Sequence, residues 1–360
     1  MPISAEVLSA TIEELLPRLE MTFWRWSPLL DKFYKAERIK KDSPSGPFRK
    51  FRLMTGAPGQ ATPVIYGTES LSSPRRDTVT TGTVYGGRVI YHFKVPGKEM
   101  AEVNTDDDVD NIIEQYPIAG LQDMHIGMTK QLLIGNQAQY NNLVTFNGAA
   151  QYDSDSGASR DGIFSFSDPG SQSTPAYGVT KKGGTGGVAD WYNGFASINS
   201  MGDDGQSKIR REMYRAGRAH PSYGTPDCLI ADETSYNNYV DMRDDRVITL
   251  NQFTGAEGSD NGHEGIHVSK SAVMYLEEYL DIDNATVVAQ NGIIYGLNTK
   301  AWTYMVIGKD SEREGKGWFE IRKPLRMPDE EAWKWEIVFH GNPYTTNLNS
   351  NFVIVGGHQE

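Results

Sequence analysis

The sequence predicts an α+β protein, in which strands and helices are mixed without the regular alternation of a doubly wound sheet. Two observations lead to this prediction. Apolar residues alternate with a period of two, as strands require, at residues 79–85, 89–95 and 333–339. They recur at three- and four-residue steps, as a helix requires, over residues 106–134. A chain of 360 residues is long enough to bury a sizeable core in one large or two interlocked domains.

Charge and cysteine usage narrow the class of protein. The net charge of −12 argues against a nucleic-acid-binding protein of the usual basic kind. The single cysteine, Cys228, cannot form an internal disulfide and should pack as a small hydrophobic residue, consistent with synthesis in a reducing cytoplasm. No apolar run approaches the roughly 18 residues of a membrane span, and residues 1–6 do not resemble a signal peptide. We therefore expect a soluble protein with no membrane partner.

The N-terminal region combines aromatic and basic residues. Residues 8–16 predict a short amphipathic helix that ends near Pro17, a second apolar segment reaches Tyr34, and residues 48–54 look extended. Residues 31–52 hold eight basic side chains against three acidic ones. Two interpretations stay open for this stretch: a docking arm for an acidic partner, or a solvated face beside a helix anchored by its aromatic residues.

A hairpin followed by a long helix is the clearest local prediction. The alternating segments 79–85 and 89–95 flank Gly86-Gly87, and two glycines can take the positive φ of a tight hairpin turn. Thr105 then precedes three aspartates, which suit the start of a helix. A helix over residues 106–134 would be about 40 Å long, with a bend at Pro117.

The remaining segments are predicted in order along the chain. Residues 147–205 contain 12 Gly and 9 Ser and predict an exposed elaboration with a strand at 163–166. Helices are expected at 203–219 and after a cap at Thr234. Strands are expected at 227–231, 302–307, 333–339 and 352–355, and a hairpin should join 286–289 to 293–295 through Asn291-Gly292.

One motif has the form of a catalytic metal site. His263-Glu264-Gly265-Ile266-His267 matches the H-E-x-x-H pattern of zinc hydrolases, which requires both histidines one turn apart on a helix. Loop-forming glycines precede the motif and Gly265 lies inside it, so a polar loop is the favoured interpretation and a zinc hydrolase the alternative. We expect no catalytic residue, cofactor or metal site, since P-loop, calcium-loop and serine-hydrolase patterns are all incomplete.

In their order, these elements resemble the major capsid proteins of tailed bacteriophages, the Hong Kong 97-type fold. The resemblance rests on the hairpin, on the helix ending in LLIGN (132–136), on CLIADETSY (228–236), on GIHV (265–268) and on the closing strand NFVIVG (351–356). It implies an N-terminal arm (1–50), an extended hairpin loop (51–103), a spine helix (104–146) and a surface elaboration (147–205). Further on it implies peripheral-domain segments (206–250 and 331–360) on either side of an axial domain (251–330).

The resemblance also implies a function. The chain would self-assemble into hexamers and pentamers of an icosahedral head that encloses double-stranded DNA without sequence-specific binding. Scaffold, portal and decoration proteins would be its partners, and a virion assembled in the bacterial cytoplasm its location. An encapsulin-type nanocompartment shell is an alternative. The implied assembly residues are Gly86, Gly87 and Arg88 in the hairpin, with Lys94 and Lys98 where some members form a covalent cross-link. No acceptor asparagine or assisting acid can be matched.

Overall fold

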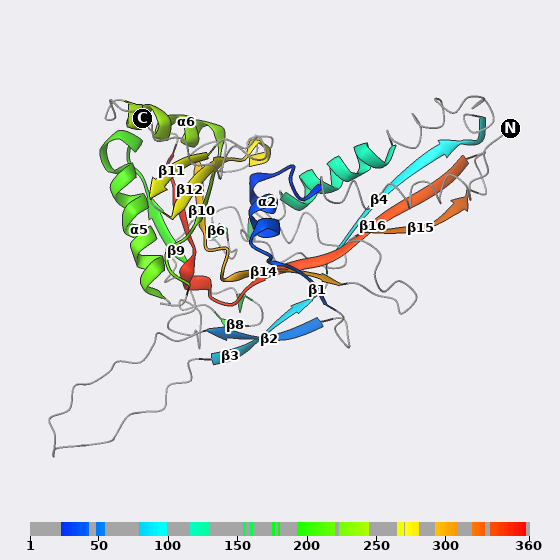
Figure 1. Cartoon of the computed structure of the whole chain (residues 1–360), viewed down its shortest axis with the longest axis horizontal. Helices are drawn as coiled ribbons and strands as arrows, with labels where there is room; N and C mark the ends of the chain where they lie inside the picture. The colour runs from blue at the N-terminus through cyan, green and yellow to red at the C-terminus, as the bar shows by residue number, and fades with distance from the viewer. Residues whose placement is uncertain are drawn as a thin grey trace, which may run out of the picture.

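The computed structural model describes residues 23–42, 48–54, 79–85, 87–98, 116–129, 193–219, 223–244, 265–269, 271–280, 292–307, 319–327 and 332–357, with four two-residue strands between residues 154 and 180. One five-stranded and one six-stranded sheet dominate these residues (Figure 1). Helices and strands follow one another irregularly along the chain. The predicted α+β class is confirmed.

The five-stranded sheet is built on β16 (Ala332–Thr345). The N-terminal part of β16 lies between β4 (Gly87–Pro96) and β15 (Phe319–Arg326), antiparallel to both. Its last residues pair with β14 (Trp302–Ile307), which also pairs with the parallel strand β1 (Ile39–Asp42). β4, β15 and residues 332–341 extend away from the rest of the molecule, and we call them the arm (Figure 1).

A helix over residues 116–129 covers the apolar face of the arm. Phe93 of β4 stacks between Trp335 of β16 and Tyr116 of the helix, with ring centroids 5.7 and 5.6 Å away. A Cβ on Gly120 would lie 2.3 Å from the Tyr91 ring, so the small residue permits this close approach of helix and sheet. Because apolar residues on both elements face each other, the contact forms part of the main core.

The long-helix prediction is confirmed for the part that the structure describes. Leu121, Met124 and Met128 are buried at the three- and four-residue steps that the sequence predicted. The predicted residues 106–115 and 130–134 lie outside the described residues, as does the first predicted helix at 8–16. Pro117 lies in the first described turn, so the predicted bend remains untested.

The N-terminal aromatic residues anchor helix α2 (Pro28–Lys35) in the core. Ser27 caps α2, because its Oγ accepts a hydrogen bond from the Leu29 backbone N–H at 3.2 Å. The same hydroxyl donates to Glu277 Oε2 at 2.7 Å, which ties the helix start to the six-stranded sheet region. Phe23 and Trp26 both make edge contacts with the ring of His125 on the 116–129 helix.

The six-stranded sheet has the order β11-β12-β10-β13-β17-β9. Its strands are β9 (Gly194–Ser197), β10 (Cys228–Ala231), β11 (Gly265–Ser269), β12 (Ala272–Leu276), β13 (Ile293–Leu297) and β17 (Phe352–Val355). The strands predicted at 227–231, 302–307, 333–339 and 352–355 are therefore confirmed. One face of this sheet contributes to the main core, which also contains α2 and the arm.

Two helices cover the other face of the six-stranded sheet (Figure 1). The π-helical turn η2 (Met201–Gly205) leads into α5 (Gln206–Ala219), which packs on β9 and β17. Helix α6 (Glu233–Asp244) packs on β12. A second hydrophobic cluster joins both helices to the sheet. The helix predicted at 203–219 is confirmed, whereas α6 is capped by Asp232 and not by Thr234.

The predicted hairpin around Gly86-Gly87 is wrong in its pairing. Strands β3 (Val79–Tyr85) and β4 occur where predicted, but β3 pairs with β2 (Phe48–Met54) and β4 pairs with β16. The physical reason is the burial of apolar surface. When β4 pairs with β16, its apolar side packs into the main core, whereas a two-stranded hairpin would leave that side without a core to pack against. The antiparallel pair is thus β2–β3, and residues 55–78 connect its strands.

Other boundaries also differ from the predicted ones. β9 is an integral strand of the six-stranded sheet, so the range 147–205 extends too far at its C-terminal end. Within that range, β5 (Ser154–Asp155) pairs with β6 (Ser159–Arg160), and β7 (Pro175–Ala176) with β8 (Val179–Thr180). The predicted strands at 163–166 and 286–289 lie outside the described residues. Among the helices that the structure describes, none combines the length and apolarity needed to cross a bilayer.

Candidate assembly surfaces

Four of the five residues that the sequence assigned to assembly are described, and they are spread along the arm and do not converge on one site. Gly87 and Arg88 begin β4 opposite Gly341 and His340, and Lys94 is exposed six residues further along the strand. At about 3.4 Å per residue, Arg88 and Lys94 are roughly 20 Å apart along the arm. Lys98 is exposed just beyond the strand, and Gly86 lies outside the described residues. The four described residues therefore lie along β4 or just beyond its end.

The outer face of the arm carries a charged ladder across its strands. Glu336 of β16 accepts hydrogen bonds from Lys334 Nζ at 2.9 Å and from Arg322 Nη1 of β15 at 3.2 Å. The Lys334 hydrogen bond is the main cause that lowers the pKa of Glu336. His340 of the same strand is half-buried, and this burial lowers the pKa of its imidazole. The ladder fixes the side chains of the outer face without enclosing a substrate.

The β2–β3 pair lies against the C-terminal end of β16. Phe51 of β2 contacts the Tyr344 ring at a centroid distance of 4.3 Å, and Leu53 is buried beside Gly82 of β3. On its other face, β2 presents the exposed Lys50. One side of this two-stranded ribbon is therefore anchored in the subunit, while the other carries solvent-exposed positive charge.

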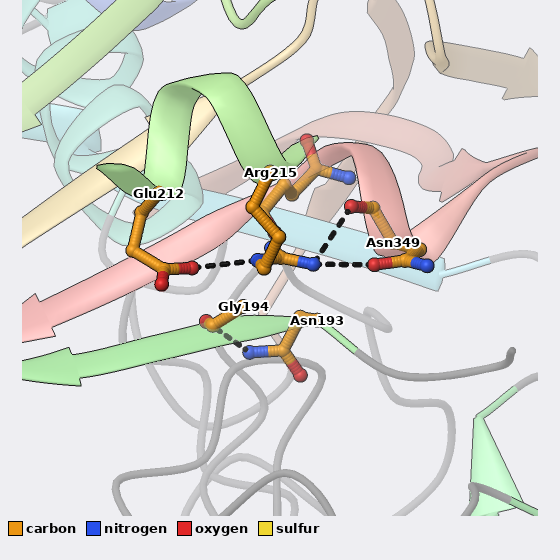
Figure 2. A network of polar contacts seen from close by, with 6 residues as sticks. Asn193, Gly194, Glu212, Arg215 and Asn349 are labelled. Atoms are coloured by element: carbon orange, nitrogen blue, oxygen red, sulfur yellow. Dashed lines mark hydrogen bonds and ion pairs between the residues drawn. The ribbon is translucent and has the colours of Figure 1, made fainter. Parts of the chain in front are cut away.

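A polar network connects α5 to the turn between β16 and β17, as Figure 2 shows. Arg215 Nε donates to Glu212 Oε2 at 2.6 Å, Nη1 donates to Asn349 Oδ1, and Nη2 donates to the Asn351 carbonyl at 3.1 Å. A Cβ on Gly194 would lie 1.9 Å from Arg215 Nη2, so only glycine leaves room for this guanidinium. The network holds helix α5 to the β16–β17 turn, and Gly194 of β9 packs closely against its guanidinium.

Asn351 is the centre of a second, fully buried set of hydrogen bonds. Its Oδ1 accepts from Trp302 Nε1 at 2.9 Å and from the Asn298 backbone N–H at 3.0 Å. Its Nδ2 donates to the carbonyls of Asn347 and Leu348 in the turn that contains η4 (Leu348–Ser350). The amide thereby joins the end of β13, the start of β14 and the β16–β17 turn, where the two large sheets meet.

Sequence analysis missed both networks. Glu212 and Arg215 are spaced like an ion pair on a helix, which was a detectable local signal. The partners Asn349 and Asn351 are 134 and 136 residues away, and nothing local connects them to the helix.

The described part of the H-E-x-x-H motif is a strand and not the helix that a zinc hydrolase requires. Gly265, Ile266 and His267 lie in strand β11, where they pair with Tyr275, Met274 and Val273 of β12. Residues four apart share one face of a strand but lie about 13 Å apart at 3.3 Å per residue, whereas one helical turn brings them close enough to bind the same zinc ion. His263 and Glu264 lie outside the described residues. Within the described part of the chain, no three His, Cys, Asp or Glu side chains form a metal-binding group.

Cys228 has the predicted environment of a packed core residue. It is fully buried in β10, and burial raises the pKa of its thiol far above the usual range. A thiol held in its neutral form is a poor nucleophile. The residue therefore contributes packing, as the apolar run 228–231 predicted.

The chain resembles solved capsid structures over most of its length. It matches a chain of the cyanophage A-1(L) capsid with a TM-score of 0.60 and 11% identity, covering 90% of this chain and 91% of the other. It matches the capsid of an empty GTA particle with a TM-score of 0.51 and 8% identity, covering 89% and 88%. An encapsulin complex from Synechococcus elongatus matches at 0.47 with 7% identity, covering 90% and 87%. No family model and no curated protein sequence matches the chain.

The cyanophage and GTA matches establish the fold. The alignment with the cyanophage structure covers about nine-tenths of each chain, so the two share their overall architecture. The likeness to tailed-phage major capsid proteins that the sequence suggested is therefore confirmed at the level of the Hong Kong 97-type fold. At about a tenth of identical residues, the likeness extends to architecture and not to individual functional residues.

Proposed function

We propose that this chain is a major capsid protein, which self-assembles into hexamers and pentamers of an icosahedral shell around double-stranded DNA. The single observation that carries the proposal is the match to the cyanophage A-1(L) capsid, with a TM-score of 0.60 over about nine-tenths of both chains. The proposal includes synthesis and assembly in the bacterial cytoplasm, and a virion as the final location. Scaffold, portal and decoration proteins are proposed as partners.

The shape of the subunit supports this function. The arm and the β2–β3 pair extend away from the six-stranded sheet and its helices, so much of the chain lies in long elements with exposed faces (Figure 1). A shell subunit needs broad surfaces that reach its neighbours, and many individually weak contacts then sum to a stable assembly. An enzyme would instead be expected to surround a pocket with converging polar groups.

The two sheets also suggest how the subunit is divided. We assign the arm and the 116–129 helix to the peripheral domain, and the six-stranded sheet with α5 and α6 to the axial domain. This assignment differs from the division expected from sequence, because β10 and β17 pair into the same sheet as β11, β12 and β13, and α5 and α6 pack on that sheet. We assign the antiparallel pair β2–β3 to the extended loop.

The charge of the chain is compatible with a container for DNA. A net charge of −12 disfavours tight binding of phosphates, which would slow the filling of a shell. We therefore expect any contact with the enclosed genome to be weak and independent of sequence.

Expression of the full chain followed by size-exclusion chromatography and negative-stain electron microscopy tests the proposal. We expect shells, tubes or ring-shaped capsomers, either from the chain alone or with co-expressed phage assembly proteins. A chain that stays monomeric under both conditions would overturn the proposal. Shells that load a host enzyme and no DNA would instead support a nanocompartment.

A further inference from the structure

Helix α5 presents a basic stripe on the side that faces away from the sheet. The stripe consists of Arg210, Arg211, Tyr214 and Arg218, all exposed, and Tyr214 is 60% exposed. The opposite side of the helix is buried against the sheet through Ile209, Met213 and Ala216. Because residues three or four apart share a helix face, the stripe is a continuous surface about 12 Å long.

The stripe differs from the other basic residues of the same helix. Lys208 is paired with Asp204 and donates to the Ser197 carbonyl, and Arg215 is held by Glu212, Asn349 and Asn351. In the part of the chain that the structure describes, no side-chain hydrogen bond or ion pair engages the four stripe residues. Three exposed arginines and an exposed tyrosine thus lie together on one side of α5.

The complementary charge lies on the neighbouring helix of the same layer. Glu233 and Asp241 of α6 are exposed on one side of the helix with the neutral Asn237 between them, and we call these three residues the acidic stripe. Helix α5 packs on β9 and β17, whereas α6 packs on β12 and on η2, the turn that leads into α5. The two stripes therefore lie on two different helices that cover the same face of the sheet.

We propose that the basic stripe of α5 in one copy binds the acidic stripe of α6 in the next copy of the same ring. This inference rests on the proposed function, since it names the surfaces that join subunits within a capsomer. Two different, complementary surfaces on one chain form a head-to-tail contact, and repetition of that contact closes a ring. The guanidinium groups would form paired hydrogen bonds with the carboxylates, and Tyr214 would supply apolar contact area.

A nucleic acid is the less favoured occupant of the basic stripe. The three arginines form only a small positive surface, and the chain as a whole carries a net negative charge. Surfaces that bind phosphates are usually broad and strongly basic. Arginine and tyrosine together are typical of protein–protein contacts, where they often contribute most of the binding energy.

Charge reversal tests the pairing in the full chain. The first variant is Arg210→Glu/Arg211→Glu, and the second is Asn237→Lys/Asp241→Lys. For each variant alone, we expect the subunit concentration at which half of the chains are in rings to rise at least about tenfold, because an attractive contact becomes repulsive. The control, Lys300→Glu, reverses an exposed cation outside α5, α6 and the arm and should assemble like the wild type. Circular dichroism should show unchanged folding in all variants, since every altered side chain is exposed.

Mixing the two variants gives the sharpest result. In an equimolar mixture, each reversed α5 meets a reversed α6 when the copies alternate around a ring. Alternation is possible in a hexamer and impossible in a pentamer, so we expect negative-stain images with six-membered rings and no five-membered ones. A single chain carrying all four substitutions should form both kinds of ring.

The outcomes separate this inference from the proposed function. If wild-type chains form rings and both reversals assemble equally well, the stripe inference fails alone. It also fails if reversal blocks assembly and neither the mixture nor the four-substitution chain restores it. If the arginine reversal leaves assembly intact but removes salt-sensitive binding to a DNA duplex, the occupant is nucleic acid and the inference is overturned. A wild-type chain that never assembles would refute both proposals.

Discussion

The stack of Phe93 between Trp335 and Tyr116 should control the stability of the arm. Phe93 is only 6% exposed, and its ring joins strand β4 both to β16 and to the 116–129 helix. Truncation to alanine removes a buried aromatic ring and leaves a cavity, which typically costs about 3–5 kcal/mol. We expect Phe93→Ala to lower the free energy of unfolding by that amount, measured by urea denaturation followed through tryptophan fluorescence.

Two further substitutions on β4 separate the effect of ring stacking from the effect of burying apolar volume. Phe93→Leu keeps most of the apolar volume and loses the stacked geometry, so it should cost about 1–3 kcal/mol for two aromatic pairs. Ile90→Ala alters the other face of the same strand, where the side chain is 39% exposed, and should cost less than about 1 kcal/mol. If Phe93→Ala and Ile90→Ala destabilise the protein equally, the inner and outer faces of the arm have been assigned incorrectly.

Three other predictions concern single groups. Gly194→Ala should destabilise the protein by about 1–3 kcal/mol, because the added Cβ would displace the Arg215 guanidinium. An unchanged melting temperature would contradict the close approach of Gly194 to Arg215. Asp232→Ala should lower the free energy of unfolding by a similar amount, because the carboxylate accepts hydrogen bonds from the Ser235 N–H and from the Ile293 N–H at 2.7 Å. Asp232→Asn keeps one acceptor oxygen and should lower the melting temperature less. Burial lowers the pKa of His340 below its ordinary value of 6.5. The unfolded chain therefore binds a proton at this residue before the folded chain does, so the free energy of unfolding should be highest above pH 6.5 and should decrease as the pH falls below that value. His340→Gln should remove that part of the pH dependence between pH 7 and 5, and identical pH profiles would refute the assignment.

Local pattern was enough to place β2, β3, β4, β10, β13, β14, β16 and β17, together with the helices at 116–129, 206–219 and 233–244. The alternation of Trp333, Trp335, Ile337 and Phe339 identified β16, and the spacing of buried residues identified the helix that covers it. Both patterns reflect one buried face per element, which a sequence displays directly. The same holds for the core position of Cys228, which follows from its apolar neighbours.

The pairing of the strands could not be predicted in the same way. Gly86-Gly87 between two alternating segments satisfies every local requirement of a hairpin, yet β4 pairs with a strand about 245 residues away in sequence. The competing partners differ in how much apolar surface they bury, which is a property of the whole fold. The Arg215 and Asn351 networks escaped prediction for the same reason, since their hydrogen bonds join distant segments.

The buried amide of Asn351 links these observations to the shape of a shell subunit. β16 belongs to the arm at its start and reaches the six-stranded sheet through the turn that leads into β17, so this turn sets the angle between the two sheets. Asn351 fixes the turn by accepting from Trp302 and Asn298 while donating to Asn347 and Leu348. Buried hydrogen bonds with several partners tolerate little rotation, because any displaced group would lose its partner away from water. The angle between arm and sheet domain is thus held by directional bonds as well as by apolar packing, which suits a subunit whose proposed function depends on reproducible curvature.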